Sequence, residues 1–231
     1  RVNPDVDPNT HPYISTGLKE NKFGVSVEEA LTLYQEATEL DSLKIVGVDC
    51  HIGSQITELR PFLDALTRVL SLVDKLEDQS ITLEHIDLGG GIGVQYRDEV
   101  PIEIGDFASE IEQAMSGRSQ SLMFEPGRMI VANAGVLLTT VNTLKGNDEK
   151  NFAVVDAAMN DLIRPALYSA WQEVTPVSFK VDGASIERNW DIVGPICETG
   201  DFLAKDRALS LEEDDLLAIL SAGAYGFVMS S

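Results

Sequence analysis

The sequence is short of basic residues, of cysteine and of long apolar runs. Only 17 lysines and arginines stand against 38 aspartates and glutamates, so the net charge is −21. A chain this acidic repels nucleic acid and anionic membranes. Its two cysteines are too few for a disulfide framework and favour a reducing cytoplasm. Because no signal peptide or membrane-spanning apolar run is recognisable, we expect an acidic globular protein of the cytoplasm.

The composition nevertheless supports a sizeable core. Hydrophobic residues make up 44% of the 231 residues, which is ordinary for globular proteins and fits one large domain or two smaller ones. The chain begins "RVNPDVDP" without an initiator methionine and ends in the apolar run "GAYGFVMSS". We therefore expect a piece of a longer protein.

The first part of the chain alternates predicted strands and helices. Helices are expected over 26–40, 60–78 and 105–117, and strands over 44–50, 83–89 and 121–131. Ser26 and Glu29 form a capping box, and Pro61 suits a first helical turn. This order predicts parallel strands with helical crossovers. It fits either part of a (β/α)₈ barrel or an open doubly wound sheet.

Helical periodicity fades after about residue 130. Strand-like runs separated by turn residues follow at 134–144, 151–156, 176–182 and 215–228. This spacing is typical of an antiparallel β domain, either a sandwich or a barrel-like sheet. The fold class is therefore α/β plus β, with predicted domains at 1–132 and 133–231.

Three polar motifs follow three of the predicted parallel strands. They are "CHIGSQ" at 50–55, "GGG" at 89–91 and "EPGR" at 125–128. In parallel α/β folds, sites form where strands end, so these motifs should converge. Three bare glycines suggest a phosphate held by backbone N–H groups, although neither the dinucleotide fingerprint nor the P-loop pattern fits. No metal site is predicted.

Each motif also has a purely structural interpretation. In that interpretation His51 makes only a hydrogen bond in a loop, the glycines form only a tight turn, and Glu125 pairs with Arg128. Cys197 is then a small buried apolar residue, and Arg164 stacks on Tyr168.

The motifs taken together resemble one family, the fold-type III pyridoxal-phosphate decarboxylases, and within it the diaminopimelate branch. The resemblance runs along the whole chain, through "RVNP", "NKFG", "HIGSQI", "DLGGGIG", "EPGR", "VVDAAMNDLIRPALY", "CETGD" and "GAYG". It implies a (β/α)₈ barrel joined to a β-sandwich-like domain. It also implies lysine formation from meso-diaminopimelate with pyridoxal 5'-phosphate as cofactor.

The resemblance assigns several residues to the cofactor. Glu125 would pair with the pyridine nitrogen and His51 would stack on the ring. The phosphate would be held by the glycine triplet and its neighbours, namely Gly89, Gly90, Gly91, Arg128 and Ser54. Tyr225 would add a contact from the second domain.

The resemblance assigns other residues to the substrate. Arg164 and Tyr168 would hold its distal carboxylate, a role that Arg128 could share. Glu198 would pair with the distal amino group, and Cys197 would be the general acid that returns a proton after decarboxylation. In the family "CETGD" comes from the second subunit, so a homodimer with shared sites is expected.

Two other interpretations remain open. Ornithine- and arginine-type decarboxylases share the barrel motifs, although ornithine has no distal carboxylate for Arg164. A non-catalytic homologue that binds a partner is the third candidate, because the family's "YAxKAN" motif with its cofactor-anchoring lysine is missing. We expect the chain alone to be inactive for that reason.

Overall fold

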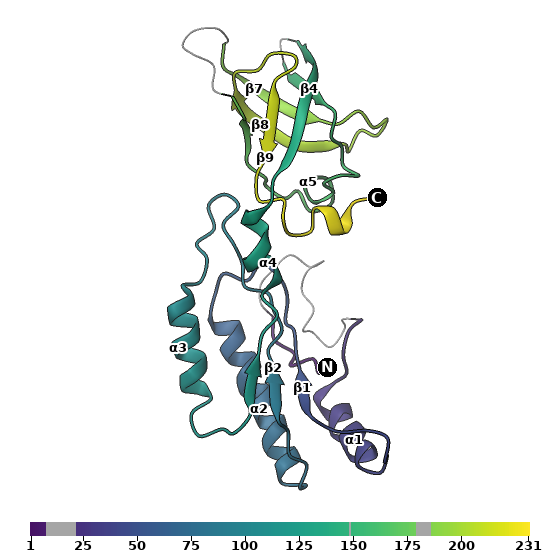
Figure 1. Ribbon diagram of the computed structural model, residues 1–231, viewed down its shortest axis with the longest axis vertical. Helices are drawn as coiled ribbons and strands as arrows, with labels where there is room; N and C mark the ends of the chain where they lie inside the picture. The colour runs from purple at the N-terminus through teal and green to yellow at the C-terminus, as the bar shows by residue number, and fades with distance from the viewer. Residues whose placement is uncertain (8–21, 148, 179–185) are drawn as a thin grey trace. The chain divides into compact units, whose positions relative to one another are not determined.

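The computed structural model describes residues 1–7, 22–147, 149–178 and 186–231, which form two compact regions (Figure 1). The α/β region comprises residues 1–94 and 100–127, and the β region comprises residues 95–99 and 128–231. This division falls before the predicted boundary at residue 132. Most of helix α4 (Gly127–Val131) belongs to the β region, and so does the short segment 95–99.

The α/β region contains three parallel strands, as the alternating pattern predicts. They are β1 (Gly47–Asp49), β2 (His85–Asp87) and β3 (Ser121–Met123), in the spatial order β1-β2-β3. Val48, Ile86 and Leu122 lie side by side across this sheet. The carboxyl ends of all three strands therefore meet at one edge.

The helices between these strands begin and end close to their predicted limits. They are α1 (Val27–Thr38), α2 (Arg60–Glu77) and α3 (Ile104–Ala114). The Ser26 hydroxyl accepts a hydrogen bond from the Glu29 amide, which confirms the predicted N-cap. Consecutive helices contact each other, α1 with α2 and α2 with α3, as they do in the single outer layer of a barrel. This contact favours the barrel over an open doubly wound sheet, whose helices cover both faces.

The β region is built on one six-stranded sheet with the order β6-β9-β4-β5-β7-β8. Its strands are β4 (Leu137–Gly146), β5 (Asn151–Val155), β6 (Val174–Pro176), β7 (Arg188–Val193), β8 (Phe202–Leu209) and β9 (Leu216–Ile219). The edge strands β6 and β8 also contact each other, so the sheet curls toward a barrel. The prediction of a wholly antiparallel domain was wrong at one point, because β5 and β7 are parallel.

Several predicted strands were too long. The run 121–131 is a strand only to Met123 and becomes helix α4 after Pro126, which cannot donate to a strand ladder. Strand β6 ends at Pro176, where the prediction for 176–182 begins, and residues 179–182 lie outside the described part. The run 215–228 contains the short strand β9 and then a 3₁₀ turn, η2 (Phe227–Met229). A second 3₁₀ turn, η1 (Ala132–Ala134), and helix α5 (Arg164–Tyr168) complete the fold.

Each region has a hydrophobic core of its own. Helix α2 contributes much of the first core through residues such as Leu66, Leu72 and Val73, which are fully buried. The second core gathers Ile192, Leu203 and Ile219 from three strands of the sheet. Among the described residues no helix is long and apolar enough to cross a membrane.

Candidate active site

The loops that follow β1 and β2 are joined by backbone hydrogen bonds. The Ile56 amide donates to the Gly91 carbonyl at 2.8 Å, and the Gly93 amide donates to the Ile56 carbonyl at 2.9 Å. The Gln55 side chain donates to the Val94 carbonyl and accepts from the Val94 amide, at 2.6 and 3.2 Å. The motifs "CHIGSQ" and "GGG" are therefore brought together, as predicted.

The three glycines leave no room for side chains, because the backbone of neighbouring loops packs directly against them. A Cβ atom on Gly90 would stand 2.1 Å from the Glu125 carbonyl oxygen, and one on Gly91 would stand 2.4 Å from that of Gly53. Gly89 and Gly91 also have positive φ angles of 68° and 110°, which favour glycine. Close packing of the loops thus requires the triplet, and it also brings Glu125 to the same strand ends.

His51 lies over this triplet and accepts a hydrogen bond from it. The Gly90 amide donates to His51 Nδ1 at 3.1 Å, so the ring is held with that nitrogen unprotonated. Burial lowers the pKa of His51, and the positive charge of Arg1 lowers it further. The imidazole is therefore neutral at pH 7. His51 is thus hydrogen-bonded to the loop that follows β2, and half-buried Ser54 lies three residues further along its own loop.

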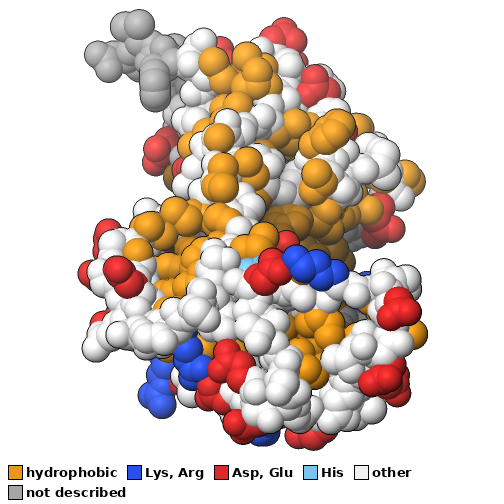
Figure 2. Space-filling view, turned by 60° about the horizontal axis from the view of Figure 1, so that its bottom comes forward, with side chains coloured by type: hydrophobic (Ala, Val, Ile, Leu, Met, Phe, Trp, Pro, Cys, Tyr) orange, Lys and Arg blue, Asp and Glu red, His pale blue; other side chains and the backbone are white. Residues whose placement is uncertain are grey.

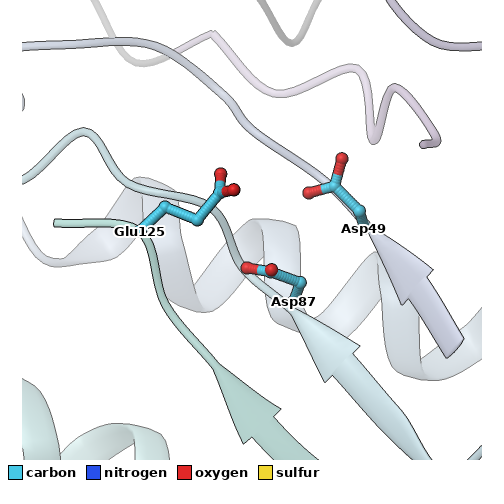
Figure 3. Close-up of side chains that lie close together, drawn as sticks. All are labelled: Asp49, Asp87 and Glu125. Atoms are coloured by element: carbon cyan, nitrogen blue, oxygen red, sulfur yellow. The ribbon is translucent and has the colours of Figure 1, made fainter. Parts of the chain in front are cut away.

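Three carboxylates gather at the strand ends and form what we term the acid cluster: Asp49, Asp87 and Glu125. Their oxygen atoms lie within 4.8 Å of one another, each from the end of a different strand (Figure 3). Burial raises the pKa of Asp49 and of Glu125, and the negative charge of Asp87 raises both further. Sequence analysis identified only Glu125. The two aspartates were missed because each lies inside a predicted strand, over 44–50 and 83–89.

The acid cluster suits a positively charged group. Asp87 accepts a hydrogen bond from the Gly89 amide at 2.8 Å. Within the described residues, the buried Oδ1 atom of Asp49 has no hydrogen-bond partner. Three close carboxylates and an unsatisfied buried acceptor would be stabilised by a cation or an N–H donor. A protonated ring nitrogen has both properties, so these residues fit the predicted cofactor.

The β region contains a different site, in which two buried arginines flank one tyrosine. We term Arg128 and Arg164 the arginine pair; each residue is only 7% exposed. Arg128 Nη1 donates to the Tyr96 hydroxyl at 2.5 Å, and the Arg164 guanidinium lies over the Tyr96 ring, 4.4 Å from its centroid. Tyr96 was missed by the sequence analysis, although it follows the glycine motif closely.

Other predicted residues join the arginine pair. The Arg128 guanidinium lies 4.7 Å from the centroid of the Tyr225 ring, whose residue remains 41% exposed. Arg164 Nη1 donates to the Gln172 side chain at 2.5 Å. Burial lowers the pKa of Arg164, the Arg128 charge lowers it too, and Tyr96 and Tyr168 oppose this shift. Two like charges in a buried setting favour the approach of an anion.

Cys197 and Glu198 stand on an exposed loop between β7 and β8. The loop is tied down by buried Asp201, whose carboxylate accepts from the Met159 and Ile196 amides at 2.7 and 2.9 Å. Glu198 accepts from the Gly200 amide at 3.1 Å. Cys197 is exposed, so its interpretation as a buried apolar residue was wrong. Asp201 was not singled out, although it ends the motif "CETGD".

Basic side chains are scarce on the surface as well as in the sequence. Figure 2 shows acidic groups spread over the face in view, with few basic ones among them. The buried arginines of the β region therefore place positive charge locally in a chain whose net charge is −21.

Comparisons with known proteins place these features in context. Residues 1–132 match the family model described as "Pyridoxal-dependent decarboxylase, pyridoxal binding domain". Over 231 residues the chain is 64% identical to a diaminopimelate decarboxylase of Pseudomonas aeruginosa, covering 100% of this chain and 55% of that protein. A diaminopimelate decarboxylase of Vibrio cholerae is 54% identical, with the same coverage of 100% and 55%.

A solved structure agrees with the sequence relatives. The crystal structure of diaminopimelate decarboxylase from Helicobacter pylori, complexed with L-lysine, superposes with a TM-score of 0.94 and 44% identity. It is matched over 100% of this chain and 57% of its own length. The chain thus spans little more than half of the relatives it matches. Since the family model covers more than half of the chain, the chain belongs to the pyridoxal-dependent decarboxylase family.

Proposed function

We propose that the whole protein to which this chain belongs removes CO₂ from meso-diaminopimelate and yields L-lysine, as a carboxy-lyase of the cytoplasm. The α/β region would be the later part of a (β/α)₈ barrel that holds pyridoxal 5'-phosphate. Support comes from the names of the relatives and from the family model over residues 1–132. The L-lysine in the Helicobacter pylori structure is the product that this reaction would give.

The acid cluster supports the use of this cofactor. When bound, pyridoxal phosphate accepts the electron pair that departing CO₂ leaves behind, and it does so best with a protonated ring nitrogen. Glu125 would pair with that nitrogen. Asp49 and Asp87, whose carboxylates lie within 4.8 Å of Glu125, would add to the negative field that keeps the proton in place.

The residues around the acid cluster would hold the remainder of the cofactor. A neutral His51 can stack on an aromatic ring without adding charge, and Ser54 offers a hydroxyl. Gly89, Gly90 and Gly91 expose backbone at the same strand ends, although the Gly89 and Gly90 amides already donate to Asp87 and His51. Phosphate binding there would use the remaining donors of the loop, with Arg128 and Tyr225 as the expected contributions of the β region.

The arginine pair is the observation that best supports diaminopimelate as the substrate. Arg164 is 7% exposed, and among the described residues it contacts the neutral groups of Gln172 and Tyr96. A planar guanidinium in this setting suits a carboxylate, which can accept two parallel hydrogen bonds. Tyr168 and Arg128 would complete the contact. Ornithine has no second carboxylate, so an ornithine-type enzyme would have no use for Arg164 here.

The exposed loop at Cys197 and Glu198 supports a role for a second subunit. Cys197 would return a proton to the carbon that lost CO₂, and Glu198 would pair with the distal amino group of the substrate. Asp201 holds the loop through two backbone amides, so both side chains are presented on a fixed backbone. We expect a homodimer in which each subunit supplies this loop to the other.

The choice of substrate can be tested in the whole protein with Arg164→Ala. Loss of a buried charged partner costs roughly 2–5 kcal/mol, so CO₂ release from meso-diaminopimelate should fall about thirtyfold or more. Turnover of substrates that lack the distal carboxylate should change little. Arg188→Ala, at an exposed position of β7, is the matched control. Equal losses on both kinds of substrate, or faster turnover of ornithine by the unaltered protein, would contradict the proposal.

A further inference from the structure

A pocket lies in the β region, and neither residue of the arginine pair lines it. It has a volume of about 180 Å³ and lies among α5, the segment that follows it and β8. Apolar and aromatic groups supply much of its wall, and Lys205 and Arg207 supply positive charge. The complete lining is Pro165, Ser169, Ala170, Trp171, Phe202, Ala204, Lys205 and Arg207. We term it the Arg207 pocket.

Arg207 has donors that nothing in the described part of the chain satisfies. The residue is 6% exposed, and within the described residues only Nη2 makes a hydrogen bond, donating to the Gln172 carbonyl at 2.9 Å. The buried Nε and Nη1 atoms have no partner among the described residues. Leaving buried N–H groups unpaired is costly, and more so when the group is charged.

Trp171, which contacts Arg207, also has a buried donor without a hydrogen-bond partner in the described residues. This donor is the indole Nε1 of Trp171. The Arg207 and Arg97 guanidiniums lie over its ring, with Cζ atoms 3.0 and 4.2 Å from the ring centroid. The ring face can stabilise cationic charge, but it accepts none of the in-plane N–H bonds. All three unsatisfied atoms are therefore donors.

The neighbouring carboxylates do not supply the missing acceptor. Glu173 and Asp206 raise the pKa of Arg207, yet neither forms an ion pair with it within the described residues. Burial is the larger effect and lowers the pKa of Arg207 to about 10. The guanidinium is therefore still charged at neutral pH.

We propose that the Arg207 pocket binds a small oxyanion, the carboxylate or phosphate group of a small molecule. An oxyanion can accept hydrogen bonds from the Nε and Nη1 donors of Arg207, either along the Nε–Nη2 edge or along the Nη1–Nη2 edge of the planar guanidinium. Lys205 adds attraction at the exposed side of the pocket, and the aromatic walls suit a small organic remainder. This binding does not depend on the decarboxylase reaction.

The two tryptophans of the chain permit a direct test by NMR. The Trp190 indole donates to the Leu209 carbonyl at 3.0 Å, whereas that of Trp171 is unsatisfied, so their ¹H–¹⁵N signals should differ. Trp171→Phe identifies the Trp171 signal. The ¹⁵N-labelled chain is titrated with sodium phosphate or with sodium acetate, at constant ionic strength set by chloride. We expect a saturable shift of the Trp171 signal with at least one probe, and none of the Trp190 signal.

Variants link the shift to Arg207. Arg207→Gln removes the charged donors to the oxyanion, so the affinity for the probe should fall at least about tenfold. Arg188→Gln, at an exposed position of β7, should bind like the unaltered chain. If Arg207→Gln fails to fold, Arg207→Lys keeps the charge without the planar fork and should weaken binding by a smaller factor. The proposal is overturned if neither probe shifts the Trp171 signal, or if the folded Arg207 variant binds as before.

The two probes also distinguish the source of the oxyanion. A shift with phosphate alone indicates a phosphorylated ligand, and a shift with acetate alone indicates a carboxylic acid. Because neither titration requires cofactor, substrate or turnover, failure here would leave the proposed decarboxylase function untouched.

Discussion

The α/β region and the β region each concentrate charge of one sign, and the signs are opposite. In the first, Asp49, Asp87 and Glu125 meet at the ends of three strands. In the second, Arg128 and Arg164 flank Tyr96. Both clusters raise the free energy of the empty protein, since like charges repel in each and burial also removes water from the arginine pair. Each is therefore prepared for a ligand of the other sign.

A pyridoxal-dependent decarboxylase has two binding tasks, one for its cofactor and one for its amino-acid substrate. The acid cluster would stabilise a cationic ring, and the arginine pair would hold a carboxylate. Neither task is visible in the total charge of −21, which averages over the surface. Local charge, not composition, is the informative quantity for function in this chain.

The largest predicted effect comes from removing the central carboxylate of the acid cluster. In the whole protein Glu125→Gln should lower kcat by about 10²–10³, the range found when one electrostatic partner of the reacting centre is lost. Glu110→Gln, on the exposed face of α3, is the control. Assay of CO₂ release measures both variants. Activity close to that of the control would show that Glu125 does not pair with the ring.

An intermediate effect on activity is expected when a protein altered in the α/β region is mixed with one altered in the β region. Glu125→Ala and Cys197→Ala proteins should each be inactive alone. If Cys197 serves the partner's site, a mixed dimer has one site with both lesions and one with neither. Random exchange makes about half of the dimers mixed, so activity should recover to about a quarter of the unaltered level. No recovery after demonstrated exchange of subunits would assign Cys197 to its own chain.

The smallest effect concerns pH. The pKa values of Asp49 and Glu125 are raised in the folded chain, so folding binds protons there, and the resulting stabilisation grows as pH falls through those raised values. It is complete below the ordinary values of 3.8 and 4.5. Asp87→Asn should lower both pKa values and reduce this gain. Carboxyl ¹³C titration measures the pKa values, and unchanged values in Asp87→Asn would contradict coupling within the cluster.

Much of the α/β region was predictable because its signals are local. The Ser26 cap lies within four residues of the amide it accepts from, and the apolar stripe of α2 repeats at helical spacing over 18 residues. The convergence of the three strand-end motifs was also predictable, because parallel strands place their carboxyl ends together.

The remainder depended on partners distant in sequence. Strands β7 and β8 were not predicted because charged residues interrupt them, and buried Asp191 is satisfied by Lys150, 41 positions away, at 2.5 Å. Tyr96 joins the site through Arg128, 32 positions away, and through Arg164, which is still more distant in the sequence. Residues 127–131 were assigned to a strand because a short apolar run does not distinguish strand from helix.

The crowding around Gly90 has a consequence for large-scale mutagenesis. A library scored only by enzymatic activity would mark Gly90 as intolerant and invite the conclusion that it touches the cofactor. Yet any side chain there would collide with the Glu125 carbonyl oxygen, 2.1 Å from the position of its Cβ atom. Loss of soluble protein would then account for the loss of activity. Scoring the same library for cellular abundance would separate residues that shape the loops from residues that perform the reaction.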